Sequence, residues 1–125
     1  MKANTKIVYA EDDKIIARLT MIKLKTAGFD VHYLDNGNDV LNSIKTVLPS
    51  IVLLDIMMPG KDGITILKEM KLIPEVKDIP VIFLTSLSDK SSVTDGLKFG
   101  AADYVLKPYT TDNLINRIRK QIKST

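Results

Sequence analysis

The chain contains no cysteine, so it can form neither a disulfide framework nor a thiolate metal site. None of its apolar runs approaches the length that a membrane span requires. Residues 1–6 pass directly into a predicted strand, without the apolar core of a signal peptide. From these absences we expect a chain that is not inserted into a membrane and works in a reducing, cytoplasmic compartment.

Glycine-rich nucleotide loops are absent too. Neither GxGxxG nor GxxxxGK[ST] occurs in the 125 residues, which argues against dinucleotide and P-loop nucleotide binding. The net charge is only +3, and bases gather locally near the end of the chain, at Arg117, Arg119, Lys120 and Lys123. We interpret this group as a solvated helix face and expect no direct binding of nucleic acid.

The chain does contain a regular alternation of short apolar runs and stretches with helical periodicity. Its composition, 45% hydrophobic and 26% charged, is typical of a globular protein, and we expect one domain over residues 1–125. Five short apolar runs read as buried strands, at residues 7–10, 31–34, 51–54, 81–84 and 104–106. The run at 31–34 is the candidate for a sheet edge.

Each run is followed by a stretch with helical periodicity. Aliphatic residues recur there at spacings of three or four: Ile15, Leu19 and Ile22; Val40, Leu41, Ile44 and Val47; Ile64, Leu67 and Met70; Val93 and Leu97; and Leu114, Ile115, Ile118 and Ile122. The fourth stretch is the weakest, because it contains Gly96 and two serines. The (βα)₅ alternation predicts an α/β fold, a parallel sheet with helices on both faces.

Four of the apolar runs end on reactive polar residues. Glu11 and Asp12 follow the first run, Asp55 the third, Thr85 the fourth and Lys107 the fifth. Ligands of open parallel sheets bind beyond the carboxyl ends of the strands. We therefore expect these carboxylates, this hydroxyl and this amine to line one pocket.

The acidic residues favour a hard cation in that pocket. Carboxylate oxygens from two strand ends suit Mg²⁺, which takes few protein ligands and keeps several waters. An alternative for Glu11 and Asp12 is a solvated, acidic helix start. That alternative loses weight because Asp55 ends another buried run, where carboxylates are rare unless they are paired or bound to metal.

Together these motifs resemble the receiver domain of bacterial two-component response regulators. They are Glu11-Asp12, Asp55-x-x-Met58-Pro59-x-x-Asp62-Gly63, Thr85-Ser86 and Lys107-Pro108. The resemblance covers the whole chain, in the order and at the spacings of the family. It implies a flavodoxin-like (βα)₅ fold with strand order 2-1-3-4-5, either as a chemotaxis-type single-domain receiver or as the N-terminal receiver of a longer regulator.

The resemblance also implies roles for individual residues. Asp55 corresponds to the phosphoryl acceptor, and Thr85 and Lys107 to the hydroxyl and amine that contact phosphoryl oxygens. Glu11 and Asp12, with Asp55 and the backbone carbonyl of Met57, correspond to the ligands of Mg²⁺, for which Mn²⁺ is a substitute. Asp13 would be the next residue rather than a ligand, and a one-position ambiguity remains in this acidic run.

Two further roles rest on the same resemblance. Tyr104 corresponds to a rotating switch residue, although a strand residue simply packed on the fourth helix is the competing interpretation. Met57 and Leu87, two positions beyond Asp55 and Thr85, correspond to the positions that tune dephosphorylation. The family also suggests a cis Lys107–Pro108 bond. His32 lies away from the site, and we interpret it as structural rather than as a phosphodonor.

The leading hypothesis is a switch that takes a phosphoryl group from a sensor histidine kinase or a histidine phosphotransferase. The surface formed by the fourth helical stretch, the strand at residues 104–106 and the last helical stretch would then be read by a downstream protein, an output domain or a second copy in a phosphorylation-dependent homodimer. Such a chain is no enzyme beyond its own phosphorylation and dephosphorylation. One alternative is an aspartyl-phosphate phosphohydrolase, but Met57 stands where its general acid is needed. Another is a phosphorylation-independent interaction module.

Overall fold

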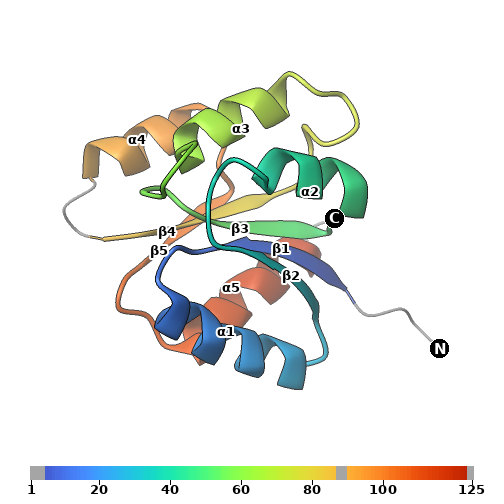
Figure 1. Ribbon diagram of the computed structural model, residues 1–125, viewed down its shortest axis with the longest axis vertical. Helices are drawn as coiled ribbons and strands as arrows, with labels where there is room; N and C mark the ends of the chain where they lie inside the picture. The colour runs from blue at the N-terminus through green and yellow to red at the C-terminus, as the bar shows by residue number, and fades with distance from the viewer. Residues whose placement is uncertain (1–4, 87–89, 124–125) are drawn as a thin grey trace.

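The computed structural model describes residues 5–86 and 90–123, where five strands alternate with five helices (Figure 1). The elements are β1 (Lys6–Ala10), α1 (Lys14–Thr26), β2 (Asp30–Leu34), α2 (Val40–Val47), β3 (Ile51–Asp55), α3 (Gly63–Lys71), β4 (Val81–Thr85), α4 (Lys90–Lys98), β5 (Asp103–Leu106) and α5 (Thr111–Lys123). All strand pairs are parallel, in the order β2-β1-β3-β4-β5. This is the predicted flavodoxin-like topology, with β2 at an edge.

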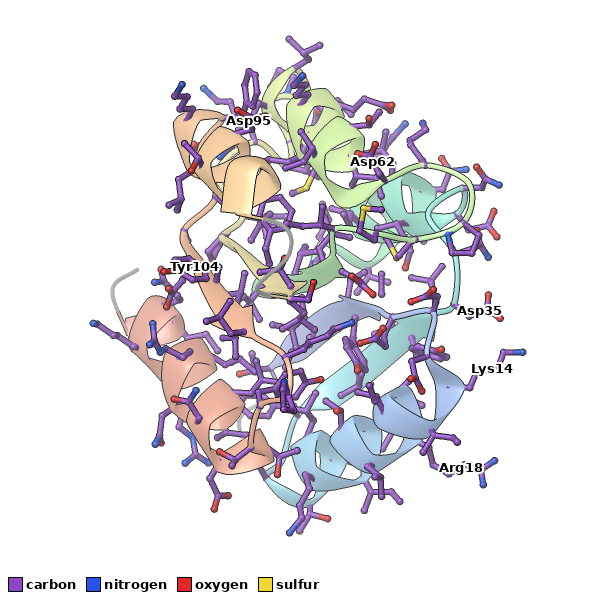
Figure 2. All side chains as sticks on the ribbon, turned by 90° about the vertical axis from the view of Figure 1, so that its left-hand side faces the viewer. Lys14, Arg18, Asp35, Asp62, Asp95 and Tyr104 are labelled. Carbon is purple, nitrogen blue, oxygen red and sulfur yellow. The ribbon has the colours of Figure 1, made fainter. Side chains whose placement is uncertain are left out.

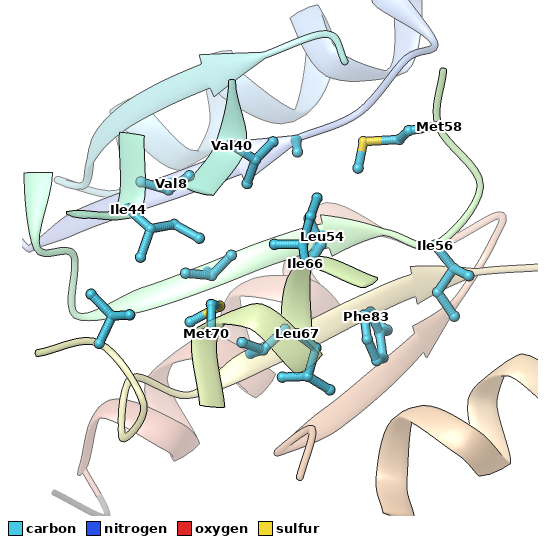
Figure 3. Packing of buried hydrophobic residues seen from close by; sticks show 14 residues of the cluster. Val8, Val40, Ile44, Leu54, Ile56, Met58, Ile66, Leu67, Met70 and Phe83 are labelled. Atoms are coloured by element: carbon cyan, nitrogen blue, oxygen red, sulfur yellow. The ribbon is translucent and has the colours of Figure 1, made fainter. Parts of the chain in front are cut away.

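The helices form a layer on each face of the sheet: α2, α3 and α4 cover one face, and α1 and α5 cover the other (Figure 1). Successive strand residues point to opposite faces. In β1, Val8 therefore belongs to the core under α2 and α3, whereas Tyr9 belongs to the core under α1 and α5. Figure 3 shows the first of these two cores, where Val40 and Ile44 of α2 meet the sheet. None of the described helices is long and apolar enough to cross a membrane.

The starts of three helices are capped by side chains that the sequence places there. The carboxylate of Asp13 accepts hydrogen bonds from the backbone N–H groups of Ile15 and Ile16, at 3.0 and 3.1 Å, and opens α1. Asp62 opens α3 in the same way. The hydroxyl of Thr110 accepts a hydrogen bond of 3.1 Å in the first turn of α5. These caps fix where each helix leaves its strand-end loop.

Helix α1 lies where the periodicity predicts a helix, but its buried face is a different one. The three aliphatic residues that predict it are exposed at 77%, 61% and 55%: Ile15, Leu19 and Ile22. The residues turned to the sheet are Ala17, Thr20 and Leu24. The helix is thus apolar on two sides, and one apolar side faces solvent.

Helix α4 approaches the sheet closely because of a glycine. A Cβ atom at Gly96 would lie 2.3 Å from the ring of Phe83 in β4. The glycine that weakens the helix prediction is therefore the residue that permits this packing. Of the two apolar residues expected on α4, Leu97 is 46% exposed, and the side chain of Val93 lies outside the described part of the structure.

Candidate functional site

Three charged groups meet at the carboxyl ends of the strands. Asp55 is the last residue of β3, Glu11 follows β1 directly, and Lys107 follows β5. The ammonium nitrogen of Lys107 lies 2.9 Å from Oδ2 of Asp55 and 2.8 Å from Oε1 of Glu11. The parallel register brings these residues together, although 96 positions separate Glu11 from Lys107.

Burial sets the electrostatics of this trio. The side chain of Glu11 is fully buried, and that of Asp55 is 7% exposed. Burial, helped by the neighbouring Glu11, raises the pKa of Asp55 to about 8, against the opposing effect of Lys107. Burial alone would lower the pKa of Lys107, but its hydrogen bonds to Glu11 and Asp55 outweigh that effect and raise it. The two carboxylates thus share one ammonium and favour a further positive charge.

The oxygens of the site fit a divalent cation. One carboxylate oxygen from each of Glu11, Asp12 and Asp55 lies within 4.8 Å of the other two. Oε1 of Glu11 is buried and makes no hydrogen bond among the described residues, although the Lys107 ammonium is close. An all-oxygen set of this kind suits Mg²⁺ or Mn²⁺ rather than a soft metal.

A cavity of about 430 Å³ opens above these carboxylates. Its described lining residues are Glu11, Asp12, Asp13, Ile16, Asp55, Met57, Ser86 and Lys107. The backbone N–H of Met57 donates a 3.2 Å hydrogen bond to Oδ1 of Asp55, which ties the loop after β3 to this carboxylate. Ligation by the Met57 carbonyl stays a prediction.

The structure separates the three acids that follow β1. Glu11 points inward to Lys107, and Asp12 belongs to the group of three carboxylates. The carboxylate of Asp13 instead caps the N-terminus of α1. Asp13 is thus a helix cap, and ligation by Asp12 stays a prediction.

The remaining predicted residues lie on β4 and β5. Thr85 ends β4 with 2% of its surface exposed, and its backbone carbonyl accepts a 2.6 Å hydrogen bond from the N–H of Lys107. The Lys107–Pro108 peptide bond is cis. Figure 2 places Tyr104 on the outer side of the molecule between α4 and α5, where it is 37% exposed. Leu87 lies outside the described residues.

Comparison with known proteins identifies the family of this chain. Residues 7–119 match the sequence profile of the response regulator receiver domain. The chain belongs to this family. A receiver domain is a module of two-component signalling and acts as a switch rather than as an enzyme.

Solved structures agree with this membership. A Chloroflexus aurantiacus protein classed as a response regulator shares 29% identity and a TM-score of 0.90, over 96% of this chain and 98% of its own. The receiver domain of the Francisella response regulator 1452 shares 35% identity and a TM-score of 0.87, over 97% and 98%. The BeF₃-activated receiver domain of Klebsiella pneumoniae RstA shares 34% identity and a TM-score of 0.85, over 94% and 98%.

Ser86, named in the sequence as part of the Thr85-Ser86 motif, lines the cavity. Two tyrosine contacts near the site were not predicted from the sequence. The hydroxyl of Tyr33 donates a 2.6 Å hydrogen bond to the backbone carbonyl of Glu11. The hydroxyl of Tyr109 lies 3.0 Å from that of Thr20. Nothing in the sequence indicates the partners of these tyrosines, because they depend on how β2 and the segment after β5 pack against β1 and α1.

Proposed function

We propose that Asp55 accepts a phosphoryl group from a sensor histidine kinase or a histidine phosphotransferase, in a reaction that depends on Mg²⁺ or Mn²⁺. One observation carries the proposal: a carboxylate at a buried strand end lies 2.9 Å from an ammonium and within 4.8 Å of two more carboxylates. A nucleophile, a cationic group for phosphoryl oxygens and a cation site are thus adjacent. Phosphoryl transfer to a carboxylate requires this combination.

The chemistry follows from these groups. A carboxylate oxygen of Asp55 forms a bond to phosphorus while the bond from phosphorus to the imidazole nitrogen of the donor breaks, and that nitrogen keeps the electron pair. Asp55 must be ionised to react, and Lys107 favours its ionised form. Glu11 and Asp12 would hold the divalent cation, which supplies positive charge so that two anionic groups can approach each other. The ammonium of Lys107 would contact a phosphoryl oxygen.

The donor would approach over α1. A second hollow, of about 410 Å³, lies between α1 and the segment after β5, and shares Ile16 and Lys107 with the acidic cavity. The exposed aliphatic side chains of Leu19 and Ile22 line it. Figure 2 shows Lys14 and Arg18 projecting from the same helix into solvent. An apolar helix of the donor, bound on this surface, would hold its phosphohistidine beside Asp55.

The signal would leave through α4, β5 and α5. The hydrogen bond from the backbone N–H of Lys107 to the backbone carbonyl of Thr85 joins β5 to β4 at the site. Tyr104 pairs in register with Phe83, the residue on which α4 packs at Gly96. Movement of Thr85 toward a phosphoryl oxygen would therefore change the surface near Tyr104. A downstream protein, an output domain or a second copy of the chain would read that change.

Intact mass spectrometry tests the acceptor. Incubation with acetyl phosphate and Mg²⁺ should add the mass of one phosphoryl group to the wild type and none to Asp55→Asn. Asp35→Asn is the matched control, because Asp35 follows β2 and lies outside the cavity. Excess chelator should abolish uptake. A gain that persists in Asp55→Asn places the acceptor elsewhere.

A further inference from the structure

Three hydroxyl groups form a cluster beside the acceptor site. The hydroxyl oxygen of Tyr109 lies 3.0 Å from that of Thr20 in α1 and 3.4 Å from that of Tyr9 in β1. Tyr9 is fully buried and Thr20 is 2% exposed. The cluster joins β1, α1 and the segment after β5.

The segment that bears Lys107 is fixed at both of its ends. Its start is tied to β4, because the Lys107 N–H donates to the Thr85 carbonyl at 2.6 Å. Its other end is tied to α1 through the hydroxyls of Tyr109 and Thr20. Between these two attachments the Lys107 side chain extends to Glu11 and Asp55. The direction of this ammonium therefore depends on where Tyr109 is held.

Packing alone does not account for the hydroxyls. The Tyr109 side chain packs against the core under α1 and α5. A phenylalanine ring would fill the same place, and an apolar residue at position 20 would avoid burying a hydroxyl. Burying a hydroxyl is unfavourable unless it is hydrogen bonded, and the bond it makes is directional. The polar pair thus selects one position for this segment, whereas an apolar pair would allow several.

We propose that the Tyr109 hydroxyl, held by Thr20, is a positioning group that keeps the Lys107 ammonium aligned with Asp55 for phosphoryl transfer. The inference rests on the proposed function of Asp55 and adds a residue to it. Tyr109 acts through Lys107 and does not itself contact the phosphoryl group.

Two isosteric variants and one conservative variant test the proposal. Tyr109→Phe and Thr20→Val each remove a hydroxyl and keep the shape, whereas Thr20→Ser keeps the hydroxyl. The maximal rate of phosphoryl uptake from acetyl phosphate should fall about fivefold in the first two and stay near wild type in Thr20→Ser. The Mg²⁺ concentration at half-maximal rate should not change, because Glu11 and Asp12 are untouched.

A double-mutant test separates positioning from general loosening of the fold. If Tyr109 acts through Lys107, Tyr109→Phe should slow uptake in the wild type but have no further effect in a Lys107→Met background. A fivefold loss in both backgrounds would overturn the proposal. So would a Tyr109→Phe protein that reacts as fast as wild type.

An NMR measurement tests the role of Tyr109 without relying on phosphoryl uptake. In the unphosphorylated protein, the ¹⁵Nζ resonance of Lys107 should shift in Tyr109→Phe and Thr20→Val but not in Thr20→Ser. An unchanged resonance in the first two variants would refute the positioning role even if uptake fell. Conversely, a wild type that takes up no phosphoryl group would refute the function proposed for Asp55, while the Lys107 resonance would still decide the role of Tyr109.

Discussion

The hydroxyl of Tyr33 donates a hydrogen bond of 2.6 Å to the backbone carbonyl of Glu11. The backbone N–H of Glu11 also donates to the carbonyl of Leu34, at 3.1 Å. Both backbone groups of this buried acid are therefore held by β2, an edge strand of the sheet. The ring centroids of Tyr33 and Tyr9 lie 5.7 Å apart, and this ring contact fixes the orientation of Tyr33. An edge strand thus positions the first acidic residue of the site.

Tyr33→Phe should weaken Mg²⁺ binding about three- to tenfold, which corresponds to the loss of one hydrogen bond that orients a ligand-bearing loop. Isothermal titration calorimetry measures the affinity directly. Tyr104→Phe is the matched control, because it removes a tyrosine hydroxyl on β5, outside the described lining of the acidic cavity. Equal affinities in the wild type and Tyr33→Phe would mean that β2 does not position the metal ligands.

Asp12→Ala and Asp13→Ala should affect different properties, metal affinity and stability respectively. Asp12 belongs to the three-carboxylate cluster, so its removal should weaken Mg²⁺ binding by an order of magnitude or more. Asp13 caps α1, so its removal should lower the free energy of unfolding by about 1 kcal/mol and leave metal affinity nearly unchanged. Calorimetric titration and denaturant unfolding of each variant separate the two roles. The reverse pattern would shift the ligand register by one residue.

The fold and the strand-end residues were accessible from sequence because both depend on local patterns. Buried parallel strands are continuous apolar runs, and their last residues face the same edge of the sheet. The gathering of Glu11, Asp55 and Lys107 followed from that rule alone. Individual roles such as that of Tyr104 came only from the family, and they remain predictions.

The buried face of α1 was not accessible in the same way. This helix carries aliphatic residues on two sides, so periodicity locates it without choosing the side that packs on the sheet. The side that packs on the sheet carries the polar residue Thr20, whose buried hydroxyl lies 3.0 Å from that of Tyr109, a residue 89 positions away. A polar residue on a predicted helix is expected to be exposed unless its distant hydrogen-bond partner is known. Long-range polar pairs of this kind leave no signal in a single sequence.

Removal of the Asp55 carboxylate should stabilise the metal-free protein. Its pKa is raised from 3.8 to about 8 in the fold, so between these pH values the folded state binds more protons than the unfolded state. Stability from this group is therefore present below about pH 4 and is lost as the pH rises to about 8. Asp55→Asn should raise the midpoint of thermal unfolding at pH 8 by about 5 °C, with chelator present.

Thermal unfolding at pH 5 and at pH 8 checks both the sign and the cause. The gain in Asp55→Asn should be smaller at pH 5, where Asp55 is already protonated in the folded wild type. Mg²⁺ should stabilise the wild type at pH 8 more than the variant. A variant that is less stable than wild type at pH 8 would show that the ion pair with Lys107 outweighs burial and the repulsion from Glu11.

Thr85 and Tyr104 should couple the acceptor site to the output surface. The hydroxyl of Thr85 should move toward a bound phosphoryl group, and the vacated space should let Tyr104 turn inward, as a shift between two arrangements. Beryllofluoride with Mg²⁺ should therefore change NMR chemical shifts in α4, β5 and α5 of the wild type. Thr85→Ala should reduce these changes, and Thr85→Ser should retain most of them. Unchanged shifts in the wild type would mean that this coupling is absent.

Self-dephosphorylation should be slow for a receiver domain. Hydrolysis of the acyl phosphate needs a water held in line with the breaking bond, and positioning that water is most of the catalysis. Met57 lines the acidic cavity with a side chain that is 62% exposed, and neither it nor Leu87 can orient a water by a useful hydrogen bond. Both would shield the phosphoryl group, which suits a sustained response.

Polar replacements at the same positions should therefore accelerate phosphate loss. The double variant Met57→Asn, Leu87→Glu should lose its phosphoryl group about tenfold faster than wild type, because an amide and a carboxylate can hold the attacking water. Met57→Leu is the matched control, since it keeps an apolar side chain at the cavity and should decay at the wild-type rate. Phosphate release after removal of excess acetyl phosphate gives each rate. If the double variant decays no faster than wild type, other groups position the water, and the persistence of the signal has a different origin.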